Sequence, residues 1–247
     1  MKNLKMKWNK LYDYPKSVRE LIENKRHYAI GTEKLPSVTT ILSATASSEK
    51  QESLKRWKEK VGEKEAERVK NVAASRGTAM HSYLEYHLEG QGLLDLTEIG
   101  QEAERMAKTI IDKGLPDLEE IWGLEATLHY PGRYAGATDC CGVYMGRESI
   151  IDFKQSNRPK KEEWIEDYYY QLVAYATAHN EVYKTNIDQG VILMCTPDLF
   201  FQRFILNGKR FREYQQLWLE RVERYYETIN ESRRDSEPVQ LSDINYG

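Results

Sequence analysis

The sequence predicts an α/β fold in which helices flank a central mixed β-sheet. Helical patterns come first, followed by three strand-like segments, a helix, two further strand-like segments and a last helix. The stretch from Tyr134 to Lys154 has the pattern of a β-hairpin at the centre of this order. The chain has 247 residues, 40% of them hydrophobic, which is ample for a buried core. We expect one domain with an N-terminal helical part (1–95), an α/β core (119–230) and a flexible tail (232–247).

The first part of the chain has no clear period. Residues 1–34 alternate between polar and aromatic, and only Ser17 to Asn24 suggests a short helix, so we expect an irregular lobe. Ser37 is a candidate N-cap for a helix from Val38 to Ala44, because its hydroxyl can accept from a free amide of the first turn.

Three further helices are expected before the sheet. A highly charged helix begins near Ser47 and runs to about Val72, with Trp57 as its anchor into the core. The next spans Ser75 to Leu88, and a third spans Thr97 to Lys113, where a glycine follows.

The strands follow. Ile121 to His129 reads as the first strand, on which Glu125 faces away from the apolar positions. Ala135 to Tyr144 alternates as a half-buried strand, Gly146 to Glu148 supplies a turn, and Ser149 to Lys154 begins the next strand.

The C-terminal part completes the α/β order. A helix from Glu162 to about Asn180 precedes an apolar strand from Gln189 to Thr196, which pairs with Phe200 to Leu206. Arg212 to Asn230 has the apolar stripe of a last helix.

Two carboxylates and one amine are expected to meet on the central hairpin. Asp152 and Lys154 are two residues apart and share a face, whereas Ile151 and Phe153 point to the other; Asp139 lies on the neighbouring strand. Rigid carboxylates are the oxygen ligands that Mg²⁺ or Mn²⁺ accepts, and a nearby ammonium can stabilise charge on a phosphate. The pattern suggests metal-assisted phosphodiester hydrolysis. For an isolated D-x-K tripeptide, ordinary strand-end acids and a solvated lysine are the better interpretation.

The overall charge constrains the partner. The net charge is −3 and the pI is near 6.0, which counts against a broad basic face for duplex DNA but leaves room for a local basic groove. Some of the 17 tyrosines could stack on unpaired bases. No run reaches the length of a transmembrane helix, and the N-terminus has no signal-peptide or transit-peptide pattern, so we expect a cytoplasmic protein without a membrane partner.

The three cysteines are expected to be small buried residues. Cys140 and Cys141 are adjacent and point to opposite strand faces, so a strain-free disulfide between them is not expected. With Cys195 they number three, too few for a four-cysteine iron–sulfur cluster.

Four short motifs follow one another along the chain. They are Arg76-Gly77-Thr78-x-x-His81, Gly136-Ala137-Thr138-Asp139, Asp152-Phe153-Lys154 and Gln171-Leu172-Val173-Ala174-Tyr175. In this order they resemble the RecB-like branch of the PD-(D/E)XK nucleases. Within that branch the chain is most similar to the group of mitochondrial genome maintenance exonucleases and their phage relatives, which two early stretches, Leu35 to Thr39 and Leu54 to Lys58, also resemble. The resemblance covers roughly Leu35 to Glu227 and implies a restriction-endonuclease-like core.

The resemblance implies roles for particular residues. His81 would contact metal or phosphate, Gln171 would bind phosphate or orient water, and Tyr175 would pack against nucleotide or metal-site residues. The implied catalytic residues are Asp139, Asp152, Lys154, His81 and Gln171, and the implied metal ligands are Asp139, Asp152 and His81. The candidate DNA-binding residues are Arg76, Tyr175, Arg158, Lys160 and Lys161, and the weaker site candidates are Glu85 and Glu125. The plainer alternatives are a structural histidine, core tyrosines and solvated loop lysines.

The resulting prediction is a Mg²⁺- or Mn²⁺-dependent DNA exonuclease in a bacterial or phage-infected cell. The expected substrate is single-stranded DNA with a free end. Alternatives are an exonuclease that digests duplex ends during recombination, an endonuclease, and a catalytically silent nucleic-acid-binding protein with the same fold. A silent relative would be expected to lose one acid or the lysine, and Asp139, Asp152 and Lys154 are all present.

Overall fold

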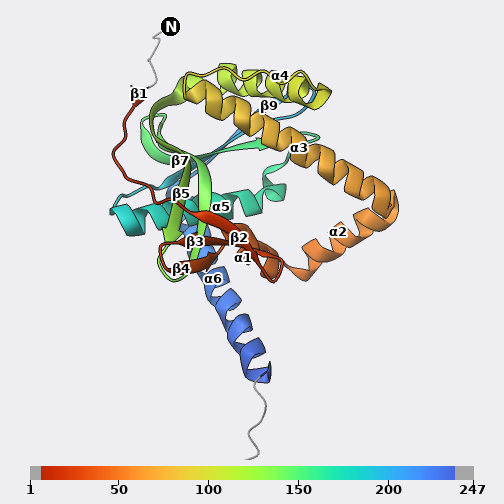
Figure 1. The fold of residues 1–247 in the computed structure, drawn as a ribbon, viewed down its shortest axis with the longest axis vertical. Coiled ribbons are helices and arrows are strands. Elements are labelled where there is room, and N and C mark those ends of the chain that lie inside the picture. The colour runs from red at the N-terminus through yellow and green to blue at the C-terminus, as the bar shows by residue number, and fades with distance from the viewer. Residues whose placement is uncertain (1–6, 237–247) are drawn as a thin grey trace, which may run out of the picture.

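The main sheet of the computed structural model, which describes residues 7–236, has six strands in the order β1-β5-β6-β7-β8-β9. Two strand pairs, β1–β5 and β7–β8, are parallel and the others are antiparallel, so the sheet is mixed. Helices cover both faces (Figure 1), which confirms the predicted α/β fold class. The strands are β1 (Lys7–Trp8), β5 (Leu118–Tyr130), β6 (Tyr134–Tyr144), β7 (Arg147–Gln155), β8 (Gln189–Cys195) and β9 (Phe201–Asn207).

The two faces of the sheet bury separate hydrophobic cores. One core lies under α3 and α4 and includes Met80 and Ile151; the other lies under α1, α5 and α6 and includes Ile150 and Trp218. Neighbouring residues of β7 thus alternate between the two cores, as the period of two along a strand requires. The helices are α1 (Val38–Ala44), α2 (Ser48–Val61), α3 (Glu63–Leu88), α4 (Glu98–Lys113), α5 (Glu166–Tyr183) and α6 (Gly208–Ser236).

The central hairpin forms as predicted, with a shorter turn. Tyr144 pairs with Arg147, and Met145 and Gly146 close the turn with φ of 50° and 74°. These left-handed values suit a two-residue hairpin turn, so β7 begins at Arg147 and the turn predicted over 146–148 was misplaced.

The sheet splits beyond the middle of this hairpin. The β6–β7 pairing ends at Cys140 and Ile151, whereas β6 stays paired with β5 as far as Tyr134 and β7 with β8 as far as Gln155. Asp139 and Asp152 are the next residues past the last pair. They therefore lie where the two strands separate.

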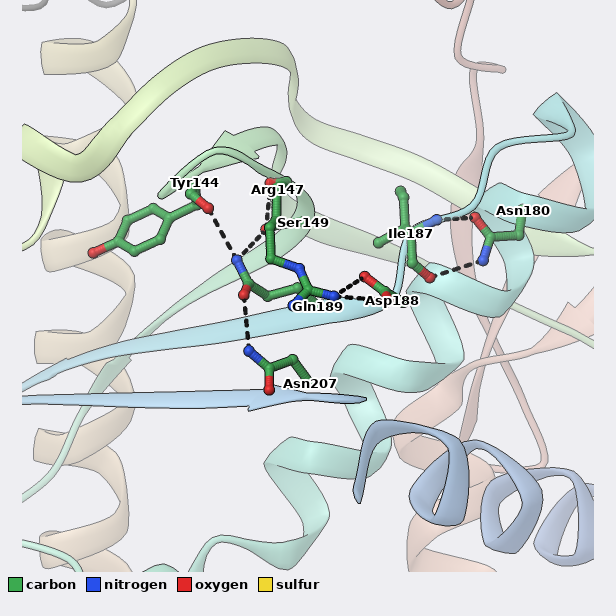
Figure 2. A network of polar contacts seen from close by, with 8 residues as sticks. All are labelled: Tyr144, Arg147, Ser149, Asn180, Ile187, Asp188, Gln189 and Asn207. Carbon is green, nitrogen blue, oxygen red and sulfur yellow. Dashed lines mark hydrogen bonds and ion pairs between the residues drawn. The ribbon is translucent and has the colours of Figure 1, made fainter. Parts of the chain in front are cut away.

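Figure 2 shows a polar network that fixes the opposite end of β7 and β8. The side-chain amide of Gln189 donates to the carbonyl of Tyr144 and to the hydroxyl of Ser149, both at 2.9 Å. Its carbonyl oxygen accepts from Asn207 at 3.2 Å. Because Gln189 is buried, these bonds satisfy groups that water cannot reach, and they join β7, β8 and β9 at this end.

A small three-stranded sheet replaces the predicted N-terminal helix. The segment from Ser17 to Asn24 was expected to be helical within an irregular lobe, but it contains β2 (Val18–Ile22), which pairs with β3 (Lys25–Ile30). The next strand is β4 (Glu33–Pro36). The part of the chain before residue 95 is therefore only partly helical.

The turn between β2 and β3 explains this correction. Glu23 and Asn24 adopt φ of 50° and 59°, and Ile22 pairs with Lys25, which is a two-residue hairpin. Asparagine tolerates the left-handed region better than most residues, so Asn24 favours a turn over continuation of a helix.

The small sheet packs on the start of β6. Tyr28, Ile30 and Leu35 form a cluster with Ala135, and an isolated bridge joins Ser37 to Ala135. Ser37 also caps α1 as predicted, because its hydroxyl accepts from the amide of Thr40 at 3.0 Å.

The charged segment predicted as one helix from Ser47 is divided at Gly62, whose φ of 84° and ψ of 148° end α2 before α3 begins. The two helices form a V that extends away from the sheet (Figure 1). No residue of α2 is buried, and Trp57 is 38% exposed. The prediction that Trp57 anchors this helix in the core was wrong.

The remaining helices match with shifted ends. The helix predicted from Thr97 begins one residue later, with Thr97 as its N-cap. A short 3₁₀ helix (Glu162–Trp164) precedes α5, and α6 begins at Gly208, before the predicted start. The predicted flexible tail is helical over 232–236, and residues 237–247 lie outside the described part of the chain.

The cysteines Cys140, Cys141 and Cys195 are buried free thiols, as expected of small core residues. In the described range, 7–236, no helix is both long and apolar enough to span a membrane.

Candidate active site

A cavity of about 360 Å³ opens beside the split of the sheet. Its walls come from α3, β5, β6, α5 and the small N-terminal sheet, and they include His81, Glu125, Asp139 and Tyr175. Residues far apart in sequence thus converge on one hollow.

The predicted trio of Asp139, Asp152 and Lys154 lies together at the split. Oδ2 of Asp139 accepts a hydrogen bond from the backbone amide of Phe153 at 2.6 Å, which ties β6 to β7 beyond their last paired residues. Asp152 is buried, and its Oδ2 lies 2.5 Å from Nζ of Lys154.

Burial and neighbouring charge set the protonation of these groups. Burial raises the pKa of Asp152 to about 6, even though Lys154 opposes the shift. Burial would also raise the pKa of Asp139, but the charges of His81 and Lys154 hold it below its usual range. Burial would lower the pKa of Lys154, yet Asp152 and Asp139 raise it, so the amine stays protonated.

His81 reaches the site from α3. Its Nδ1 lies 3.3 Å from Oδ1 of Asp139. Burial would lower the pKa of His81, but Asp139 outweighs it and raises the pKa to about 9. An imidazole and a carboxylate in contact therefore form an ion pair at neutral pH.

Glu125 completes a group of three possible metal ligands. It lies between the pairs Leu124–Cys140 and Ala126–Thr138, directly across the ladder from Asp139, and its φ is 45°. Left-handed backbone is uncommon for glutamate, and here it occurs at a candidate functional residue. Burial and then Asp139 raise the pKa of Glu125 to about 7.

The donor set fits a divalent cation. One ligand atom from each of His81, Glu125 and Asp139 lies within 4.8 Å of the others. Two carboxylates and an imidazole are suitable ligands for first-row divalent ions, and a cation would favour the ionised form of Glu125. Glu85 lines the same cavity one turn after His81 but is not part of this group of three.

Tyr175 lines the cavity and packs against Gly136. A Cβ added to Gly136 would lie 2.7 Å from Cε1 of Tyr175, so only glycine fits. Gln171 is one turn earlier on α5 and half-buried, and it is not among the described residues that line the cavity.

Arg76 is placed differently from the expected DNA contact. It is 5% exposed, and its guanidinium donates to Gln155, at 3.0 and 2.8 Å, and to Asn157. It also pairs with Glu102 at 3.4 Å. These protein oxygens hold the arginine inside the fold, so we assign it to positioning the segment that follows β7.

Gly77 also differs from its expected position. The helix predicted from Ser75 would put Gly77 in a first turn, where free amides can bind anions, but Gly77 lies in the interior of α3. Its amide is therefore within the helical hydrogen-bond ladder.

The basic loop after β7 is fixed at one point and surrounds an exposed aromatic residue. Gln202 exchanges two hydrogen bonds with the backbone of Lys160, at 2.7 and 2.8 Å. The cationic groups of Arg158 and Lys161 lie 5.7 and 5.3 Å from the ring centre of Trp164, which is 51% exposed.

The sequence analysis did not anticipate the contribution of the small sheet to the cavity. Arg19, Arg26 and Tyr28 line it, together with Ser37 and Thr39. The signal that could have found the two arginines is the β2–β3 hairpin centred on Asn24, which places both on one face.

The fold brings side chains from separate elements to one place. Two acids and a lysine lie at the split of a helix-flanked mixed sheet, a histidine reaches them from a preceding helix, and a tyrosine does so from the following one. The curated proteins to which the chain is similar are named as exonucleases.

Three curated proteins called mitochondrial genome maintenance exonuclease 1 are similar to this chain. That of Xenopus tropicalis is 25% identical over 237 residues, covering 90% of this chain and 65% of that protein. That of Mus musculus is 30% identical over 205 residues, covering 78% and 59%. That of Homo sapiens is 27% identical over 208 residues, covering 78% and 58%. The chain thus spans less than two thirds of the length of these relatives.

No family model matches the chain. Among solved structures, an alkaline exonuclease from Laribacter hongkongensis, LHK-Exo, has a TM-score of 0.31 at 12% identity, covering 63% of this chain and 84% of that one. A likeness this low carries no argument about the site.

Proposed function

We propose that this protein is a metal-dependent DNA exonuclease that acts on single-stranded DNA with a free end. The observation that carries the proposal is that His81 and Asp139 line one cavity in contact with each other, while the ion pair of Asp152 and Lys154 lies next to Asp139 at the split of the sheet. The similar curated proteins are named as exonucleases, which supports the same class of reaction.

Asp139 and Asp152 are the proposed holders of Mg²⁺ or Mn²⁺, with His81 and Glu125 as further ligands. The two strand carboxylates provide hard oxygen donors, and Glu125 extends the set because it faces Asp139. When bound, such an ion stabilises negative charge on the phosphate and makes water a better nucleophile at neutral pH.

Lys154 is proposed to act as a fixed cation. The neighbouring carboxylates of Asp152 and Asp139 raise its pKa, which favours the ammonium form. Its N–H groups can orient the attacking water or stabilise the charge that develops on the phosphate oxygens.

The residues around this centre are proposed to hold the strand. Tyr175 would pack against nucleotide, and Gln171 would bind phosphate or orient water from the same helix. Arg158, Lys160 and Lys161 would contact the DNA backbone beyond the end of β7. The exposed Trp164 between Arg158 and Lys161 adds a surface on which a base can stack.

The preference for a single strand is supported by the α2–α3 hairpin. This V-shaped projection borders a cavity of about 490 Å³. Its lining combines apolar, cationic and acidic side chains, namely Leu54, Trp57, Lys58, Glu63, Ala66, Glu67 and Lys70. Leu54 and Trp57 are exposed apolar side chains on a helix without buried residues. Aromatic and cationic groups together are typical of surfaces that bind unpaired bases, so the hairpin is a candidate guide for a threaded strand.

The experiment compares three labelled substrates: a linear single strand, a blunt duplex and a closed single-stranded circle. Each is incubated with Mg²⁺, Mn²⁺ or EDTA, using wild type, Asp152→Ala and the matched control Asp112→Ala, an exposed aspartate of α4. We expect degradation of the linear strand only, lost with EDTA and with Asp152→Ala but retained in the control.

The other outcomes select the alternatives. If the duplex is degraded at least as fast as the linear single strand, the protein is an exonuclease that acts on duplex ends. Cutting of the circle would indicate an endonuclease. If none of the three substrates is degraded with either metal, but the protein still binds DNA in a mobility-shift assay, the protein is a catalytically silent binding protein.

We further propose that residues 1–247 act as one nuclease domain and that the protein works in the cytoplasm of a bacterial or phage-infected cell. The names of the curated relatives are mitochondrial, so fractionation of cells expressing the tagged chain is the direct test of location. Limited proteolysis tests the domain, since separable parts would give stable fragments.

A further inference from the structure

Two arginines of the small N-terminal sheet enter the cavity that contains the candidate metal ligands. In the β2–β3 ladder Arg19 pairs with Tyr28, and Leu21 pairs with Arg26. Residues directly opposite share a face, and so do residues two apart, so Arg19, Arg26 and Tyr28 lie on one face. All three line the cavity together with Glu125 and Asp139.

Both guanidinium groups are available to a ligand. Arg19 and Arg26 are exposed, and neither forms an ion pair within the described part of the chain. Arg133, Arg147 and Arg203, by contrast, are each paired with a carboxylate. Arginine supplies five N–H donors in a fixed planar arrangement that fits phosphate oxygens.

The backbone that carries these arginines is held in place. The carbonyl of Arg26 accepts from the amide of Ser37 at 2.9 Å and from the hydroxyl of Thr40 at 2.8 Å, which ties β3 to the start of α1. The guanidinium of Arg19 lies 5.8 Å from the ring centre of Tyr28, which is buried. A fixed backbone and an aromatic neighbour reduce the entropy lost when a phosphate is bound.

The charge within the cavity is divided between elements. The acids Glu85, Glu125 and Asp139 come from α3, β5 and β6, whereas the two arginines come from the small sheet. A divalent ion suits the acids, but a DNA strand carries a negative charge at every nucleotide. The unpaired arginines beside the acids are therefore suited to bind a phosphate next to the phosphodiester that is cleaved.

We propose that Arg19 and Arg26 bind a phosphate of the substrate strand that flanks the phosphodiester being cleaved. This assignment rests on the proposed nuclease function and names a part of its substrate contact. The bound group is a phosphate in either case, whether an internal phosphodiester or a terminal monophosphate of the strand. Removing the arginines weakens substrate binding without removing the catalytic trio.

The test measures KM and kcat for a linear single-stranded 20-mer with Arg19→Gln, Arg26→Gln and the control Arg212→Gln, an exposed arginine of α6 outside the cavity. A charge-assisted hydrogen bond to phosphate predicts a KM raised about tenfold for each cavity variant, with kcat little changed. The dependence of binding on salt should decrease by about one charge per arginine removed. Arg26→Lys should recover part of the loss, because it keeps the charge without the planar fork.

Neutral methylphosphonate linkages identify the phosphate. One such linkage at the recognised position should raise the KM of wild type about as much as Arg26→Gln does. The same linkage should hardly change the KM of Arg26→Gln, because the contact is already lost and the two changes are coupled in a double-mutant cycle. Strands that end in a 5′-phosphate, a 3′-phosphate or a hydroxyl distinguish an internal phosphodiester from a terminal monophosphate. If a terminal monophosphate is bound, wild type will prefer one of these ends and the arginine variants will lose that preference.

The outcomes separate this inference from the proposed function. A wild-type protein that degrades no DNA overturns the nuclease proposal itself. An active wild type whose two cavity variants match Arg212→Gln in KM and in methylphosphonate response overturns the phosphate site. If the arginines only neutralise the negative charge of the acids, the variants will change the metal concentration needed for activity and leave the KM for DNA unaltered. That result would also overturn the phosphate site. Circular dichroism verifies that each variant is folded.

Discussion

Nδ1 of His81 lies 3.3 Å from Oδ1 of Asp139, so a side chain from the long helix α3 contacts the strand acid at the split of the sheet. The same carboxylate accepts a hydrogen bond from the backbone of β7 through its other oxygen. Asp139 thus joins three elements, and changes to its surroundings should affect cation binding before they affect the fold.

Glu125 and Glu85 give a matched pair of substitutions in one cavity. Glu125→Gln should raise the Mg²⁺ or Mn²⁺ concentration needed for half-maximal activity by about tenfold or more, because it removes a carboxylate close to His81 and Asp139. Glu85→Gln, which lies outside that group of three, should have a smaller effect. Metal titrations of activity measure both, and equal responses would remove Glu125 from the ligand set.

Cation binding should stabilise the folded protein. At 100 times its dissociation constant, Mn²⁺ should add about 2.7 kcal/mol to the free energy of unfolding, which corresponds to a rise in Tm of roughly 5–10 °C. Asp139→Asn should remove most of this rise, since it takes away the central carboxylate. Differential scanning calorimetry with Mn²⁺ and with EDTA measures the shift, and an undiminished shift in the variant would place the ion elsewhere.

Gly136→Ala should reduce both stability and activity. Its Cβ would meet the ring of Tyr175 at 2.7 Å, so the tyrosine or the strand must move, at a cost of about 1–3 kcal/mol. Gly77→Ala is the control, because its Cβ would lie 3.5 Å from Gln155 in ordinary contact. Alanine also favours a helix interior over glycine by up to about 1 kcal/mol, so this variant should be neutral or more stable. Urea denaturation and rate measurements on both variants decide the comparison.

His179 should make stability depend on pH below neutrality. It is fully buried, its ring nitrogens contact Tyr14 at 3.1 Å and Thr185 at 2.8 Å, and burial lowers its pKa to about 4. The unfolded chain, with a histidine pKa of about 6.5, binds the proton more readily, so stability falls as pH decreases from about 6.5 to 4. This shift corresponds to about 3 kcal/mol.

Chemical denaturation across that range, comparing wild type with His179→Gln, isolates the effect from that of the carboxylates. The difference between the two proteins should change with pH by the amount expected for one proton. His87→Gln, at an exposed position of α3, should follow wild type throughout. A pH-independent difference between wild type and His179→Gln would contradict the buried neutral histidine.

The parts of the fold that the sequence predicted correctly depend on local patterns. The hairpin of β6 and β7 follows from alternation with period two, and the cap at Ser37 follows from a hydroxyl placed before a helix. The same alternation put Asp152 and Lys154 on one face, where they form an ion pair.

The errors occurred where local preference was overridden or was weak. The segment around Arg19 has too few apolar residues for a clear period, and its strands are stabilised by pairing and by packing on Ala135. The break at Gly62 depends on one residue with a left-handed backbone. Trp57 was assigned to the core by its size, but α2 projects away from the sheet and leaves it exposed.

The sequence by itself determined the α/β order, the central hairpin and the pairing of Asp152 with Lys154, because each depends on residues close together in the chain. Only the tertiary structure decided that Glu125 faces Asp139, that Arg76 is enclosed by protein oxygens and that Arg19 and Arg26 enter the cavity. These relationships join segments that are far apart in the chain, and their geometry is set by packing across elements, which no local period encodes.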